Sequence, residues 1–170
     1  MVECYMNASI TLEQRIANLE AISEIKGLKY RYWQACDQKD PHSMIECFAS
    51  EGVVIDYEDF GCFKSADLMV KKYIAFACHP HLLESHHGKN EIIELDETGA
   101  HGTWSMNYSL VDEKNQVVIQ LNGVYQDWYI NRGSGWLIQK TKFTKMQTVK
   151  SQNLDQIICR PKAARTLGFK

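Results

Sequence analysis

Asp37 is a carboxylate near the end of a long amphipathic segment, at a position where the sequence gives it no structural role. The next residues begin a second helix, with Asp40 as the expected N-cap and Pro41 as the first helical residue. Because Asp40 can cap that helix, Asp37 is not needed there. Asp37 also lies at the negative end of the first helix dipole, which disfavours a carboxylate. It is therefore a candidate proton acceptor.

A histidine-rich segment about fifty residues later supplies the other half of a candidate site. Residues 85–92 read Ser-His-His-Gly-Lys-Asn-Glu-Ile, and we expect them to lie on a strand. His86 and His87 then point to opposite faces, so only one of them can face a pocket, and Asn90 shares the face of His86. An imidazole near a carboxylate can take up a proton and return it, which is general acid–base catalysis.

The elements that position these residues are helices first and strands afterwards. Thr11-Leu-Glu-Gln14 has the capping-box pattern and begins a helix that ends near Asp37, with Gly27 permitting a bend. Apolar residues recur along this helix at intervals of three or four, typical of an amphipathic helix. Further helices are predicted at 41–48 and 65–77, and a short strand at 52–57 with a hairpin partner at 61–63.

From about residue 85 the period of the pattern changes to two, which indicates strands. Consecutive strands with short polar turns favour an antiparallel meander. We expect one α+β domain over residues 1–170, with a core at about 10–147 and a polar tail at 148–170 that is irregular or a short helix. The aromatic residues Trp104, Tyr125, Tyr129 and Trp136 are interpreted as sheet core and interface, not as a cofactor site. The four long strands are predicted at 86–95, 99–111, 116–130 and 135–147.

Composition narrows the class of protein. Hydrophobic residues make up 45% of the chain and aromatic residues 11%, as in a packed globular core. A net charge of −2 and a pI near 6.3 argue against a nucleic-acid or acidic-membrane partner. No apolar run is long enough for a membrane span or a signal peptide. The six cysteines form no CxxC motif, so we expect free thiols and a cytoplasmic location.

The order of these elements resembles the SnoaL-like branch of the nuclear transport factor 2-like superfamily over residues 10–147. The resemblance implies a cone-shaped fold, in which a curved antiparallel sheet and three N-terminal helices enclose one pocket. It also implies a dimer or trimer, in keeping with strands that carry more apolar faces than three helices can cover. The matching pieces are Tyr32-x4-Asp37, the strand ending in Tyr57, His86 four residues before Asn90, Ala100-x-Gly102-x-Trp104, and Gly123-x-Tyr125-x-Asp127-x-Tyr129 before Gly135-Trp136.

Within that branch the chain is most similar to the bile-acid 7α-dehydratases, and more distantly to scytalone dehydratase. The dehydratase pattern implies that Tyr32, Asp37 and His86 are catalytic and that Tyr57 lies in the pocket. Dehydration next to a carbonyl needs a base for the α-proton and an acid for the departing hydroxyl. An imidazole held by a carboxylate can serve as both, and tyrosine hydroxyls can stabilise the enolate.

The chain departs from the bile-acid dehydratases in two strands. Asn107 and Tyr108 stand where those enzymes have an acidic residue, and Lys145 stands where they have an arginine. A lysine lacks the two-pronged grip of a guanidinium, so a steroid acyl thioester is not implied. We expect a small, mostly apolar hydroxy-carbonyl compound, with Tyr57, Asn90, Tyr108 and Lys145 as substrate-binding residues.

Other chemistries have weaker support in the sequence. His79-Pro80-His81 with His86-His87 suggests a metal site, but no Glu or Cys stands at a known ligand spacing, so we expect no metal. No phosphate-binding glycine motif is present, and we expect no cofactor.

Two classes of function remain open. The first is a cofactor-independent lyase (dehydratase) or isomerase, within which a polyketide-cyclase-like activity is not separable by sequence. The second is a non-catalytic ligand-binding protein or an oligomeric partner subunit.

Overall fold

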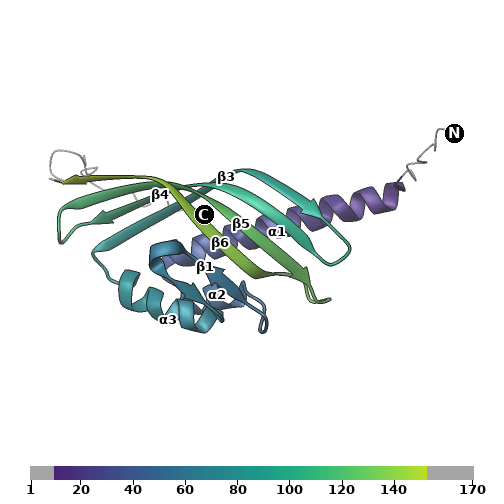
Figure 1. Cartoon of the computed structure of the whole chain (residues 1–170), viewed down its shortest axis with the longest axis horizontal. Coiled ribbons are helices and arrows are strands. Elements are labelled where there is room, and N and C mark those ends of the chain that lie inside the picture. The colour runs from purple at the N-terminus through teal and green to yellow at the C-terminus, as the bar shows by residue number, and fades with distance from the viewer. Residues whose placement is uncertain (1–9, 153–170) are drawn as a thin grey trace, which may run out of the picture.

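The computed structural model describes residues 10–152 as three helices and one curved six-stranded sheet (Figure 1). The helices are α1 (Leu12–Gln38), α2 (Pro41–Glu46) and α3 (Ala66–Ala77), with a single 3₁₀ turn at Glu58–Phe60. The strands are β1 (Val54–Asp56), β2 (Cys62–Phe63), β3 (Leu82–Leu95), β4 (Ala100–Asp112), β5 (Val117–Asn131) and β6 (Trp136–Gln152). The predicted α+β class is confirmed.

The sheet has the strand order β2-β1-β6-β5-β4-β3. Strands β3 to β6 form the predicted antiparallel meander, and β1 and β2 pair as the predicted hairpin. The predicted curved antiparallel sheet is thus confirmed for β3 to β6, and β1 makes the whole sheet mixed because it runs parallel to β6. These two strands are far apart in the sequence. No turn signal joins them, so the local pattern could not show their pairing.

The helix ends agree with the predicted caps. The Thr11 hydroxyl accepts a hydrogen bond from the Gln14 amide at 3.2 Å, which starts α1. The Asp40 carboxylate accepts bonds from the amides of His42 and Ser43, both at 3.1 Å, and so starts α2. Because Asp40 caps α2, the nearby Asp37 is left for another partner.

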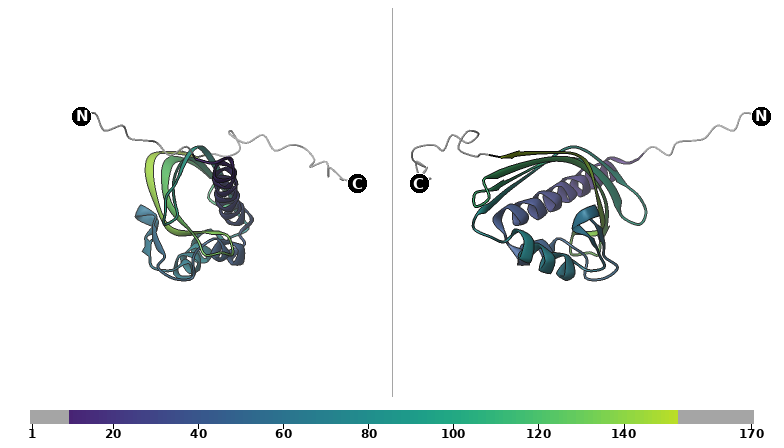
Figure 2. Two further views of the ribbon diagram at one scale, coloured as in Figure 1. Left: turned by 90° about the vertical axis from the view of Figure 1, so that its right-hand side faces the viewer. Right: turned by 60° about the vertical axis from the view of Figure 1, so that its left-hand side comes forward.

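Helix α1 lies along the concave face of the sheet, which curls around it, while α2, α3 and β1 lie at one side of the opening (Figure 2). Only the C-terminal half of α1 is buried, through residues such as Ile25, Leu28 and Trp33. The N-terminal half extends past the sheet (Figure 1), and Leu12 and Leu19 are exposed.

A glycine in β3 lets α1 approach the sheet closely. A Cβ atom at Gly88 would lie 1.9 Å from the Trp33 ring, so any larger residue would push the helix away. Trp33 also packs edge-on against Trp104 of β4, with ring centroids 5.4 Å apart. This contact fixes the distance between the end of α1 and the first half of β3, where Asp37 and His86 lie.

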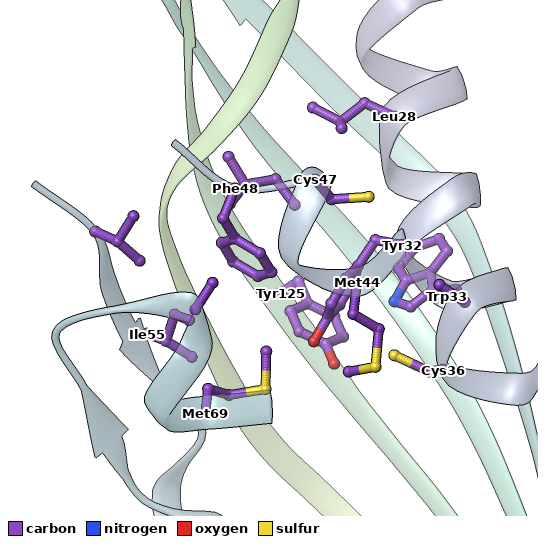
Figure 3. Packing of buried hydrophobic residues seen from close by; sticks show 14 of the residues in the cluster. Leu28, Tyr32, Trp33, Cys36, Met44, Cys47, Phe48, Ile55, Met69 and Tyr125 are labelled. Carbon is purple, nitrogen blue, oxygen red and sulfur yellow. The ribbon is translucent and has the colours of Figure 1, made fainter. Parts of the chain in front are cut away.

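The core lies between α1, α2, α3 and the sheet, and it includes aromatic and sulfur-containing side chains from several elements (Figure 3). The Tyr32 ring of α1 packs edge-on against Phe48, with centroids 5.3 Å apart. Ile55 and Met69 come from β1 and α3. The tail prediction was wrong for residues 148–152, which continue β6, and its remainder lies outside the described residues. Between residues 10 and 152, no helix is both long and apolar enough to cross a membrane.

Candidate active site

A cavity of about 530 Å³ opens between α1, α3 and the concave face of the sheet. Its volume is in the range of pockets that bind small organic molecules. Most of its lining is aromatic or aliphatic, with polar groups gathered at a few points. The lining comprises Tyr32, Cys36, Tyr57, Glu58, Asp59, Phe60, Met69, Lys72, Tyr73, Phe76, Glu84, His86, Met106, Tyr108, Leu121, Tyr125, Phe143 and Lys145.

Asp37 and His86 form a hydrogen-bonded pair beside this cavity. His86 Nδ1 lies 2.6 Å from Asp37 Oδ1, and the His86 backbone amide donates to Asp37 Oδ2 at 3.1 Å. Because a carboxylate can only accept, Nδ1 carries the proton and Nε2 is left as the basic nitrogen. The His86 side chain is 13% exposed and lines the cavity, whereas His87 is exposed and contacts Ser85. The predicted opposite orientation of the two histidines is confirmed.

Tyr32 and Tyr57 meet through their hydroxyls, which lie 2.9 Å apart. Both residues line the cavity, as predicted. Burial raises the pKa of Tyr32 well above its usual range, and it also raises the pKa of Tyr57. Both phenols therefore keep their protons at neutral pH. The pair holds two protons, and the bond between the hydroxyls uses one of them.

A third polar group, which the sequence reasoning missed, surrounds Glu84. Its carboxyl lies 2.7 Å from the hydroxyl of Tyr108 and 2.7 Å from that of Tyr73. The Tyr108 ring also packs against His86, with centroids 4.8 Å apart. The sequence contained a signal that Glu84 faces the cavity, because Glu84 is two residues before His86 and lies on the same face of the strand. The sequence pattern predicts a strand that begins at residue 86, whereas β3 begins at Leu82.

A buried ion pair lies behind the cavity. Lys29 Nζ is 2.8 Å from Asp127 Oδ2, and both side chains are fully buried. The same ammonium lies 3.8 Å from the centroid of the Tyr125 ring, which lines the cavity. Tyr125 is therefore buried, as expected for sheet core, and also forms part of the cavity wall. Burial lowers the pKa of Lys29, and the charge of Asp127 opposes this shift.

One predicted substrate-binding residue, Asn90, is placed differently from expectation. Asn90 is exposed, has φ +53° and does not line the cavity. The register of β3 shifts between Lys89 and Ile92, so the alternation that we extended from His86 is broken there. Lys145 lines the cavity as expected, and its ammonium is paired there with Asp59. Tyr108 lines the cavity as expected, and the adjacent Asn107 bonds Asn122 instead.

Groups that could hold a metal are not assembled at the histidine-rich segment. His79 stacks on His81 with centroids 5.5 Å apart, while His86 is turned toward Asp37. Within residues 10–152, no three His, Cys, Asp or Glu side chains are grouped so that they could hold a metal ion. Burial raises the pKa of the Cys36 thiol in the cavity wall, so it stays protonated and poorly nucleophilic.

Comparison with known families and structures gives a consistent result. A family model described as a SnoaL-like domain matches residues 17–142. No curated protein matches the sequence.

Three solved structures illustrate the similarity of fold. A protein from Novosphingobium aromaticivorans proposed to be a scytalone dehydratase is 20% identical, with a TM-score of 0.70 over 82% of this chain and 95% of that one. A type 2 hexachlorocyclohexane dehydrochlorinase (LinA) is 16% identical, with a TM-score of 0.71 over 88% and 97%. ActVI-ORFA from Streptomyces coelicolor is 11% identical, with a TM-score of 0.63 over 73% and 96%.

Proposed function

The chain belongs to the SnoaL-like domain family of the nuclear transport factor 2-like superfamily, and we propose that it is a cofactor-independent lyase or isomerase. In this proposal it acts on a small, mostly apolar hydroxy-carbonyl compound by acid–base catalysis. The observation that carries the proposal is the contact between Asp37 and His86 at the wall of an apolar cavity. The narrower resemblance to bile-acid dehydratases stays a prediction.

The first step is removal of a proton from the carbon next to the substrate carbonyl. His86 Nε2 is the base, because Nδ1 is already occupied by its bond to Asp37. The C–H bond breaks, its electron pair moves toward the carbonyl oxygen, and the imidazole becomes an imidazolium. The Asp37 carboxylate stabilises this positive charge and fixes the orientation of the ring.

The negative charge that forms on the carbonyl oxygen needs a hydrogen-bond donor. Tyr32 and Tyr57 are suited to this role, since the second proton of the pair is not used by the bond between them. The buried setting strengthens such a bond because few water molecules compete for it.

The final step separates a lyase from an isomerase. In a dehydration, the C–O bond of the β-hydroxyl breaks, and the imidazolium returns its proton to the departing oxygen, which leaves as water. In an isomerisation, the imidazolium returns the proton to a different carbon of the conjugated system. Both routes leave His86 neutral and need no oxidant or reductant. The names of two structural neighbours, a dehydratase and a dehydrochlorinase, describe eliminations and favour the first route.

A non-catalytic ligand-binding protein is the alternative, and the apolar lining of the cavity favours it equally. The two functions differ in the fate of the bound ligand. A carrier releases its ligand unchanged, whereas the lyase or isomerase converts it.

The test is a panel of cyclic and acyclic β-hydroxy-ketones, screened first for binding by thermal shift and then for turnover. Formation of a conjugated enone is monitored by ultraviolet absorbance. We expect turnover of at least one compound that binds, with the rate unchanged by chelator and without added nucleotide. Binding of several compounds with no conversion of any would overturn the enzyme proposal and leave the carrier.

A further inference from the structure

The hydrogen bonds around Glu84 need more protons than the neighbouring phenols can supply. Three short oxygen–oxygen contacts form a chain. Tyr108 Oη lies 2.7 Å from Glu84 Oε1, Tyr73 Oη lies 2.7 Å from Glu84 Oε2, and Tyr73 Oη also lies 2.6 Å from the Cys36 carbonyl oxygen. Each contact is short enough that a proton must lie between its two oxygens.

Two of the three protons have an obvious source. The phenols of Tyr73 and Tyr108 carry one proton each, and a backbone carbonyl such as that of Cys36 carries none. Burial raises the pKa of both phenols, so neither adds a charge of its own. A hydroxyl has one proton, and a proton shared between two acceptors makes longer contacts than 2.6 and 2.7 Å, so Tyr73 cannot serve both the Cys36 carbonyl and Glu84. The third proton has to come from the Glu84 carboxyl.

Only one arrangement places a proton in every contact. Tyr73 donates to the Cys36 carbonyl, Glu84 donates from Oε2 to Tyr73, and Tyr108 donates to Glu84 Oε1. An ionised Glu84 would leave two oxygens 2.6 or 2.7 Å apart with only lone pairs between them.

A cation lies near the Glu84 carboxyl. Lys39 Nζ lies 3.5 Å from Oε2 and favours a carboxylate, but its shorter contact is to the Ala77 carbonyl at 2.6 Å. The Glu84 side chain is only 5% exposed, and the free-energy cost of burying a charged carboxyl is offset only in part by a single ammonium at 3.5 Å.

We propose that Glu84 is a neutral carboxylic acid in the resting protein and is the positioning residue that holds Tyr108 against His86. The Tyr108 hydroxyl donates its proton to Glu84, so toward the cavity it can only accept a hydrogen bond. It therefore accepts a hydrogen bond from a hydroxyl of the substrate, while the Tyr32–Tyr57 pair donates to the carbonyl. The assignment of the substrate hydroxyl to Tyr108 and of the substrate carbonyl to the Tyr32–Tyr57 pair rests on the proposed function. The protonation of Glu84 does not.

The protonation of Glu84 is tested by infrared spectroscopy of the full chain at neutral pH, with no ligand. A protonated carboxyl has a C=O stretch above the amide band, and a carboxylate does not. We expect this band in the wild-type protein and in Glu94→Gln, which changes an exposed glutamate of the same strand. It should disappear in Glu84→Gln. Absence of the band in the wild type, or its persistence in Glu84→Gln, would overturn the proposal.

The positioning role is tested by comparing two substitutions. Glutamine matches the neutral acid, because its carbonyl can accept from Tyr108 and its amide can donate to Tyr73. Glu84→Gln should therefore lose the infrared band and keep turnover close to wild type. Glu84→Leu leaves the Tyr108 hydroxyl without the carboxyl that holds it, and it should lower kcat by about 10²-fold, as misplacement of a reacting group does.

The turnover of Glu84→Gln shows whether the reaction needs the Glu84 carboxyl itself or only the position in which it holds Tyr108. If Glu84→Gln is as inactive as Glu84→Leu while both remain folded, the carboxyl itself is required and the positioning role is wrong. If neither variant nor the wild type turns over any compound, the proposed function fails, but the infrared result on Glu84 still stands.

Discussion

Asp37 holds His86 by two separate hydrogen bonds, one to the ring and one to the backbone. The ring nitrogen Nδ1 lies 2.6 Å from Oδ1, and the backbone amide lies 3.1 Å from Oδ2. One carboxylate thus joins the end of α1 to the sheet and orients the imidazole. Both of its oxygens are used, so it cannot shift toward one partner without losing the other. This arrangement is what a base with a fixed tautomer requires.

The phenol pair should matter for chemistry more than for folding. Tyr57→Phe or Tyr32→Phe removes one hydroxyl of the bond between them, which we expect to cost about 1 kcal/mol of unfolding free energy. Either change should lower kcat about 10²–10³-fold, as loss of an oxyanion donor does. The measurements are urea unfolding and turnover of a compound that the β-hydroxy-ketone panel identifies.

Tyr129→Phe is the matched control for this prediction. The Tyr129 hydroxyl is buried between Trp104 and Asp127 and does not line the cavity. Its loss should lower stability and leave turnover nearly unchanged. If the Tyr32 and Tyr57 variants behave like the Tyr129 variant, the two phenols are core residues.

Removing one partner of the buried pair Lys29–Asp127 should destabilise the protein strongly. Asp127→Asn leaves an ammonium buried without a counter-charge, which typically costs about 3–5 kcal/mol. The double change Lys29→Met with Asp127→Asn should recover part of that loss, because no unpaired charge remains. Urea unfolding of the three proteins provides the free energies.

The comparison pair for this prediction is Lys26–Glu91, which lies one turn earlier on α1 and is partly exposed. Lys26→Ala should cost much less unfolding free energy than Asp127→Asn, as solvent weakens such a pair. A similar small cost for Asp127→Asn would contradict the account of the buried pair.

The sheet should assemble with a second copy of the chain, which so far remains a prediction from the sequence and the family. Exposed apolar residues on the strands include Ile92, Trp128 and Met146. Trp128 alternates with the buried Asp127 and Tyr129, so it faces away from the helices. Light scattering at micromolar concentration should give a multiple of 19.6 kDa, and Trp128→Glu should shift it toward the monomer.

A control for the assembly is Leu68→Glu, which places the same charge on an exposed apolar site of α3. The mass should not change. A wild-type protein that scatters as a monomer would refute the prediction, and a mass changed by Leu68→Glu alone would move the interface from the sheet to α3.

Much of the fold could be predicted from local patterns. The caps at Thr11 and Asp40 were identified correctly, because a side chain that accepts from an amide two or three residues away is a local feature. The parallel pairing of β1 with β6 could not be predicted in this way. It depends on how the chain returns to the sheet edge after α2, which no short-range signal reports.

The candidate site was partly predictable for the same reason. The pairing of Asp37 with His86 could be inferred from the order of elements and the family resemblance. Asn90 was misplaced because a bulge breaks the two-residue alternation in β3. Glu84 was missed because charged residues usually end a strand pattern, although here two phenols allow the carboxyl to be buried.

The most direct test of the proposed catalysis is a double-mutant cycle on Asp37 and His86. Asp37→Asn and His86→Ala should each lower kcat/KM by about 10²–10⁴-fold, and the double change should cost little more than either alone, because the two residues act as one unit. His87→Ala, on the opposite face of β3, should leave the rate unchanged. Full activity in the His86→Ala protein would contradict the account.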